Sequence, residues 1–140
     1  MKKIFLLLLV AVLAAACEGP TGPPGRNGLD AERIIIPVTI FNTVWRESPP
    51  NESLYYQASV PVPALTPSIR DNGTILVYRD FGNGYQQILP FTRHKEKGNV
   101  RWTQTIDYEF TDGQINFYVT NSDFIADPPE TMYFRVVLIW

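Results

Sequence analysis

An alternation of apolar and polar side chains between residues 102 and 111 constrains the fold of this chain most. Trp, Gln, Ile, Tyr and Phe occupy every second position, and Thr, Asp and Glu fill most positions between them. Successive side chains of a β-strand point to opposite faces of a sheet, so this period of two predicts a strand with one buried face. The alternation resumes after residues 111–113 with Ile115, Phe117 and Val119. We therefore expect these two strands to form a β-hairpin.

Further runs carry the β-branched and aromatic residues typical of strands, at residues 34–41, 54–60, 74–79, 85–91 and 132–140. Turn residues 71–73 and 82–84 flank the third run, which predicts a second hairpin over 74–91. Pro37 predicts an edge strand or a strand start, because proline cannot donate a ladder hydrogen bond. The last run is apolar on both sides, which predicts a central strand covered on both faces. Truncation at Trp140 is therefore expected to harm folding.

About seven short strands, with no helical period after residue 31, predict an all-β fold. We expect an antiparallel β-sandwich, with a small β-barrel as the alternative. The one candidate helical segment is 64–71, where Pro67 is expected to leave room for no more than one turn. With 140 residues and 45% apolar content, the chain is long enough for one such domain, which we assign to residues 31–140.

Residues 1–16 have the organisation of a secretory signal peptide. Lys2 and Lys3 supply a positive start, residues 4–16 are apolar throughout, and small residues precede the expected cleavage point. A membrane-spanning helix needs roughly 20 residues, so this apolar segment is too short to cross a bilayer. We therefore expect cleavage between Ala16 and Cys17.

Cys17 is the single cysteine of the chain and follows the small residues directly. The order Leu13-Ala14-Ala15-Ala16-Cys17 resembles the lipobox of bacterial lipoproteins, which implies that Cys17 is lipidated. The alternative is an ordinary secretory signal, which would leave an unpaired thiol in an exported protein. Each buried acyl CH₂ group contributes about 0.8 kcal/mol, so a multiply acylated cysteine would anchor the protein stably to a membrane.

Residues 17–30 are expected to form an extended tether with collagen-like spacing. Glycine occupies every third position, at Gly19, Gly22, Gly25 and Gly28. Only glycine fits the axis of a collagen triple helix, and proline favours the extended conformation. The segment is therefore either a monomeric spacer or the stem of a homotrimer. So few triplets provide little bonding between chains, which favours the monomeric spacer. Fully extended, residues 19–30 would have a reach of up to about 37 Å.

The combination of Cys17, Glu18-Gly19-Pro20 and the Gly-x-y triplets with a β-rich domain resembles the short collagen-repeat lipoproteins of Bacteroidota. The domain contributes further stretches to the resemblance, at residues 75–79, 103–108, 118–124 and 134–138. The resemblance implies a lipid-anchored protein of the cell envelope, in the outer membrane. The family has no established function, so the resemblance implies no catalytic residues and no cofactor.

The charge balance argues against nucleic acid as a partner. The chain has 12 Lys and Arg residues against 14 Asp and Glu residues, so it has no basic excess to attract phosphates. Its single histidine, His94, lies in the charged run 92–98, which we interpret as a solvated hairpin loop. Asp107 and Glu109 share one strand face and are expected to belong to a polar outer surface.

Catalysis and metal binding are not expected. His94 has no sequence signature of a nucleophile or an orienting acid beside it, and one His with one lipidated Cys cannot make a zinc site. Asp71, Asp112, Asp123 and Asp127 lack the spacing of a calcium loop and are better interpreted as turn residues. We therefore expect neither an enzyme nor a bound cofactor.

Aromatic side chains are the remaining indication of function. The chain has eight Phe, seven Tyr and three Trp, and six of these lie near loops or on mixed strand faces: Trp45, Tyr55, Tyr56, Tyr78, Tyr85 and Tyr118. Two functions fit, a structural or protein-interaction module of the envelope and, as the alternative, a glycan-binding module. A glycan binder should expose at least two coplanar rings in a concave patch, whereas an interaction module should expose a flat apolar patch.

Overall fold

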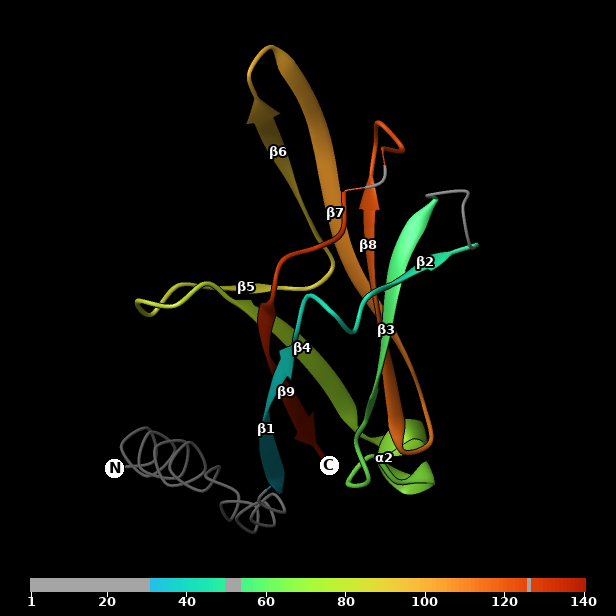
Figure 1. Cartoon of the computed structure of the whole chain (residues 1–140). Coiled ribbons are helices and arrows are strands. Elements are labelled where there is room, and N and C mark those ends of the chain that lie inside the picture. The colour runs from blue at the N-terminus through green and yellow to red at the C-terminus, as the bar shows by residue number, and fades with distance from the viewer. Residues whose placement is uncertain (1–30, 50–53, 126) are drawn as a thin grey trace, which may run out of the picture. The chain divides into compact units, whose positions relative to one another are not determined.

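The computed structural model describes residues 31–49, 54–125 and 127–140 (Figure 1). The predicted signal peptide, Cys17 and the predicted Gly-x-y tether lie outside the described residues. The described chain is an antiparallel β-sandwich, which confirms the predicted fold class. Its two sheets contain nine strands where the sequence predicted about seven, because the three-residue β2 and the charged strand β6 were not predicted.

One layer, sheet A, has four strands. Their order across the sheet is β1 (Arg33–Ile40), β9 (Met132–Ile139), β4 (Thr74–Asp80) and β5 (Gln86–Ile88). The second layer, sheet B, has five strands in the order β2 (Arg46–Ser48), β3 (Tyr55–Pro61), β8 (Gln114–Asn121), β7 (Val100–Thr111) and β6 (Phe91–Lys97). All pairings are antiparallel.

The hairpin predicted from the alternation is present as β7 and β8. Ile106 pairs with Val119 across this hairpin, and both side chains are completely buried. Phe117 of β8 packs against Phe134 of β9, with ring centroids 4.5 Å apart, so aromatic side chains of the two sheets meet in the core. Burial of this inner apolar face is the main stabilising contribution to the sandwich.

The run predicted as one strand over 85–91 is divided between the two sheets. β5 ends at Ile88, and Phe91 begins β6 in sheet B. The hairpin predicted over residues 74–91 is therefore confirmed only as far as Ile88. The charged run 92–98 was wrongly interpreted as a loop, because residues up to Lys97 belong to β6. Charged residues are common on edge strands, where they discourage pairing with other chains.

The two predictions for β1 and β9 have different outcomes. Pro37 does lie on an edge strand, because β1 pairs only with β9. Glu32 and Trp140 exchange backbone hydrogen bonds, so the alternation of the ladder leaves Pro37 at a position that needs no N–H donor. β9 is central as predicted, but its outer face is not fully covered, since Tyr133 is 54% exposed.

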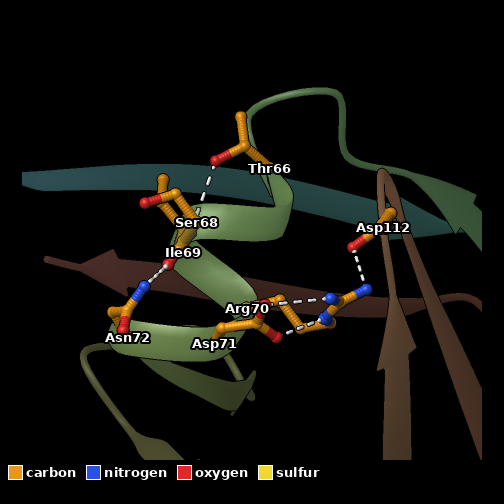
Figure 2. A network of polar contacts seen from close by, with 7 residues as sticks. All are labelled: Thr66, Ser68, Ile69, Arg70, Asp71, Asn72 and Asp112. Atoms are coloured by element: carbon orange, nitrogen blue, oxygen red, sulfur yellow. Dashed lines mark hydrogen bonds and ion pairs between the residues drawn. The ribbon is translucent and has the colours of Figure 1, made fainter.

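The single described helix, α2 (Pro67–Asn72), begins at the proline that was expected to limit it. Pro67 occupies the first turn, where a missing N–H costs nothing. The Thr66 hydroxyl caps the helix by accepting a hydrogen bond from the backbone N–H of Ile69 at 3.3 Å (Figure 2). At the other end, the Asn72 amide donates to the carbonyl of Ser68.

Arg70 joins α2 to the turn between β7 and β8. Its guanidinium contacts Asp71 at 2.8 Å and Asp112 at 2.6 Å, and Figure 2 shows it between these two carboxylates. Backbone hydrogen bonds reinforce the link, because Gly113 donates to the Leu65 carbonyl. Asp71 and Asp112 are therefore occupied in holding this end of the sandwich together.

Candidate functional site

The hairpin of β6 and β7 projects beyond the rest of sheet B. β8 pairs with β7 from Gln104 onward, whereas residues 95–102 pair only with each other. We call residues 95–102 the arm, and Figure 1 shows it extending past the strands of sheet A. The inner side of the arm therefore continues the core-facing side of sheet B without an opposite sheet to cover it.

A cavity of about 330 Å³ lies on this inner side. Val100 and Trp102, two residues apart on β7, share it with Ile125 from the segment after β8. Val100 is 51% exposed and Ile125 57% exposed, which is unusual for aliphatic side chains that lie together. The cavity therefore has an apolar wall that is open to solvent.

One residue of the cavity lining, Asn121, is a buried amide that is hydrogen-bonded to a second buried amide, Gln104. Gln104 is 2% exposed and Asn121 is 6% exposed, and the Gln104 amide donates to the Asn121 side-chain oxygen at 3.1 Å. A buried, hydrogen-bonded amide pair fixes side-chain orientation, so Asn121 is held in place in the cavity wall.

Charged side chains surround the apolar wall. Lys97, Asp123 and Asp127 complete the lining of the cavity. The Asp123 carboxylate accepts a hydrogen bond from the Ile125 N–H at 3.3 Å, and Phe124 between them has a φ of 52°. This left-handed conformation is uncommon for an aromatic residue and holds the tight turn that brings Ile125 to the cavity.

Cationic side chains lie beside the cavity on the inner side of β6. Lys95 pairs in register with Trp102, and the Arg93 guanidinium donates to the Gln104 side-chain oxygen at 3.3 Å. Burial, followed by the nearby charge of Arg93, lowers the pKa of Lys95. Arg93 also lies 3.8 Å from the carboxylate of Glu130. A partner that covers this region would therefore meet positive charge next to an apolar wall.

A second cavity, of about 430 Å³, lies on the outer face of sheet B. Tyr55 and Tyr118 line it with their rings 5.6 Å apart at 76°, an edge-to-face arrangement. Glu109 accepts hydrogen bonds from the Tyr118 hydroxyl and from the Asn116 amide. Asp107, on the same strand face, has one buried carboxylate oxygen without a hydrogen-bond partner among the described residues.

The pKa values of the ionisable groups in this second cavity are shifted in different directions. The hydrogen bonds from Tyr118 and Asn116 lower the pKa of Glu109. Burial, followed by the charge of Glu109, raises the pKa of Asp107. Burial and the hydrogen bond to Glu109 raise the pKa of Tyr118 to about 12. Near neutral pH this cavity therefore presents the charged Glu109 carboxylate beside the neutral Tyr118 hydroxyl, which suits binding of hydroxyl groups.

The structure distributes the six predicted aromatic contacts over four places. Trp45 and Tyr56 belong to the core, at 5% and 6% exposure, so they offer no surface contact. Tyr55 and Tyr118 are brought together as described above. Tyr78 lies beneath the Arg135 guanidinium, 4.5 Å from ring centroid to Cζ, on the outer face of sheet A.

Tyr85 is isolated in the turn between β4 and β5, where it is 74% exposed. His94 lies on β6, exposed, with its ring Nδ1 3.3 Å from the Thr103 hydroxyl. Within residues 31–49, 54–125 and 127–140, no three His, Cys, Asp or Glu side chains gather in a metal-binding arrangement. The sequence-predicted residues Ala16, Cys17, Gly19, Gly22, Gly25 and Gly28 lie outside these ranges.

The three apolar residues of the arm cavity were not singled out in the sequence. Trp102 was assigned to a buried strand face, which is correct for its orientation but not for its accessibility. The sequence did contain an indication that Trp102 is accessible. The alternation of β7 begins before Gln104, the first residue of β7 that pairs with β8. Ile125, directly after a turn, gave no periodic signal at all.

No protein-family model, curated protein or solved structure matches this chain. Among the described residues, no helix is long and apolar enough to span a membrane.

Proposed function

We propose that the chain is a lipid-anchored protein of the cell envelope, in the outer membrane, whose β-sandwich acts as a protein-interaction module. The lipid anchor is supported by the signal sequence and by Cys17 directly after it. The interaction role is supported by one observation above all, the open cavity with Val100, Trp102 and Ile125 as its apolar wall.

The chemistry of this cavity favours a protein partner. Protein interfaces combine an apolar centre with a polar rim, and tryptophan is enriched among the residues that contribute most binding energy. Here the apolar wall is bordered by Lys97, Asp123 and Asp127. The hydrogen bond that holds Asn121 in the cavity lining lowers the entropic cost of binding, because this side chain is already ordered when a partner side chain enters.

Glycan binding is the alternative, and the cavity around Tyr55 and Tyr118 is the observation that favours it. Glu109 and the tyrosine hydroxyls could exchange hydrogen bonds with sugar hydroxyls. The rings stand at 76° to each other, however, so they cannot both lie flat against one sugar or against two sugars in line. The protein-interaction role is therefore the better supported of the two.

Affinity capture from solubilised envelopes tests the proposal. Three tagged full-length proteins are compared: wild type, Trp102→Ala and Tyr85→Ala. Tyr85 is a matched control, because it is an exposed aromatic residue on another hairpin. We expect wild type and Tyr85→Ala to recover the same protein and Trp102→Ala to lose it by a factor of ten or more, with unchanged circular dichroism. Equal recovery by all three proteins, or glycan-array binding without any protein partner, would contradict the proposal.

A further inference from the structure

One edge of the arm has unpaired backbone groups. The backbone N–H of Ser122 donates to the Thr103 carbonyl at 2.9 Å, so Thr103 directs its backbone groups toward the side of β8. Hydrogen-bonding direction alternates along a strand, so the N–H and C=O of Arg101, two residues away, point to the same side. β8 does not extend that far, since Gln104 is the first residue of β7 in its ladder. Among the residues that the structure describes, neither backbone group of Arg101 has a hydrogen-bond partner on this side.

This edge remains open because the ladder between β7 and β8 ends at Ser122. The Ser122 hydroxyl accepts a hydrogen bond from the Thr103 N–H at 2.9 Å, in the place of a backbone carbonyl. The turn that follows, with Phe124 at a positive φ, brings Ile125 to the arm cavity on the inner side. Figure 1 shows the arm extending past the end of β8. The edge of β7 beside Arg101 is therefore available for a further strand.

A cavity flanks this edge on each side of the arm. The arm cavity lies on the inner side and includes Asn121 and Asp123, at the end of β8 and in the turn after it. A third cavity, of about 470 Å³, reaches the opposite, outer side, where Arg101, Thr103 and Ser122 line it. Both cavities thus open beside the point where the pairing of β8 ends. Side chains of a strand alternate between two faces, so a strand added here would place them in both cavities.

The two cavities differ in charge. The third cavity has two cations, Lys95 and Arg101, against one carboxylate, Glu96. That carboxylate contacts the Nε of Arg101 at 3.0 Å, so the terminal guanidinium nitrogens can bind a further carboxylate. The arm cavity instead has two carboxylates against one cation around its apolar wall. An acidic side chain is therefore favoured on the outer side of the arm, and an apolar one on the inner side.

We propose that the partner contributes an extended segment that adds to β7 as an antiparallel strand beside Arg101, with an acidic side chain on the outer side and apolar side chains on the inner side. This inference rests on the proposed protein-interaction function and specifies the chemistry of the partner. In strand addition, main-chain hydrogen bonds provide affinity and pockets for alternate side chains provide specificity.

The register of the added strand predicts a recognition sequence. One residue of an antiparallel strand can exchange hydrogen bonds with both backbone groups of Arg101. Residues directly opposite each other share a face of the sheet, so this residue is the acidic one. Its two neighbours lie opposite Val100 and Trp102 and are apolar. The expected pattern is therefore apolar, acidic, apolar.

Binding of a synthetic heptapeptide, Ser-Thr-Val-Asp-Val-Thr-Ser, to the full-length protein in detergent tests the inference by fluorescence anisotropy. Wild type is compared with Arg101→Pro, Glu96→Pro and Arg101→Ala. Proline at position 101 removes the N–H that faces the open edge and spares the ladder with β6. Glu96→Pro is the matched control, because Glu96 pairs with Arg101 in register and either proline removes their ion pair. Circular dichroism checks that each variant folds.

A second peptide tests strand pairing on wild type alone, whether or not the proline variants fold. It is methylated on the backbone nitrogen of its Asp, so it keeps every side chain but cannot donate to the Arg101 carbonyl. Side-chain contacts alone would bind both peptides equally, whereas strand addition requires the N–H.

We expect equal affinity for wild type and Glu96→Pro and about tenfold weaker binding by Arg101→Pro, with Arg101→Ala between them because it keeps the backbone donor. The methylated peptide should bind wild type about tenfold more weakly than the first peptide. Absence of saturable binding to wild type, equal affinity of wild type for the two peptides, or full affinity in a folded Arg101→Pro would overturn the inference.

This inference and the proposed function can fail separately. In the affinity capture from envelopes, Arg101→Pro should lose the partner as Trp102→Ala does. Loss with Trp102→Ala but full recovery with Arg101→Pro would retain the partner-binding cavity and overturn the strand addition. Failure to capture any protein would overturn the proposed function, whereas the two peptides would still decide whether this edge accepts a strand.

Discussion

The hydroxyl of Tyr108 donates a hydrogen bond to the backbone carbonyl of Ile75, 3.0 Å away, and thereby ties sheet B to sheet A. Ile75 lies on β4, which pairs with β5 only from Tyr78 to Asp80. Its carbonyl therefore lies where no strand covers the edge of β4, and a side chain from the opposite sheet satisfies it. Burial raises the pKa of Tyr108, in keeping with a neutral hydroxyl at this position.

Removal of this hydroxyl should destabilise the sandwich. We expect Tyr108→Phe to lower the free energy of unfolding by about 1–3 kcal/mol, because the Ile75 carbonyl loses its partner in a partly buried environment. Urea unfolding measures this directly. Tyr133→Phe is the control, since Tyr133 is 54% exposed and its hydroxyl lies in solvent-accessible surroundings. Equal stability of the two variants would show that the link between the sheets contributes nothing.

Gly73, which follows α2, should not tolerate a side chain. A Cβ atom there would lie 2.7 Å from the carbonyl oxygens of both Ile139 and Ile69, which are backbone atoms that cannot rotate away. We expect Gly73→Ala to cost about 1–3 kcal/mol, the usual cost of overpacking. Ser68→Ala, on the exposed surface of the same helix, should change stability by no more than about 0.5 kcal/mol. Thermal unfolding distinguishes the two, and similar values would contradict the close packing.

The titration of Tyr118 should depend on Glu109. Tyrosine ¹³Cζ chemical shifts should give a pKa of about 12 for Tyr118. Glu109→Gln should move that pKa toward 10 while leaving the part of the shift that is due to burial. A Tyr118 pKa that is unchanged in Glu109→Gln would contradict the hydrogen bond between them.

The raised pKa of Tyr118 also predicts how the stability of the folded protein changes with pH in alkaline solution. The folded protein holds the Tyr118 proton more tightly than the unfolded chain does, so its stabilising contribution is fully present below pH 10. It is lost as the pH rises from 10 toward 12. Unfolding measured across this range should therefore show a steeper loss of stability for wild type than for Glu109→Gln.

Cys17 should determine where the protein is found. Metabolic labelling with a palmitate analogue should label wild type, and Cys17→Ser should lose both the label and the association with membranes. In the proposed anchor the acyl chains supply the anchoring free energy, so without them the rest of the chain should not retain the protein at the membrane. An unlabelled wild-type protein would contradict the lipid anchor.

The fold could be predicted from the sequence where one face of a strand is buried and the other is exposed to solvent. β7 and β8 satisfy this condition, and their alternation predicted the hairpin correctly. β6 does not, because an edge strand with charges on both sides has no period to detect. The passage of the chain from sheet A to sheet B after Ile88 was also hidden, since which sheet a strand joins depends on packing far away in the sequence.

The candidate site could be predicted less well, because accessibility is a tertiary property. Nothing in the sequence around Trp45 and Tyr56 distinguishes them from exposed aromatic residues, yet both lie in the core. The alternation of β7 places Trp102 on the buried face of the strand, yet this residue borders an open cavity. The difference arises because the arm extends beyond the cover of sheet A, and the lengths of the two sheets are not encoded in any local pattern.

Site-specific photocrosslinking at Val100 tests the central claim, that the arm cavity binds a protein, most directly. Val100 is replaced by benzoylphenylalanine in the full-length protein, and crosslinking is triggered in intact cells that naturally produce it, with Tyr85 replaced in the same way as the control. The account predicts one protein adduct of defined mass from position 100, no such adduct from position 85, and its loss when Trp102→Ala is added. Identical adducts from both positions, or none from position 100, would contradict it.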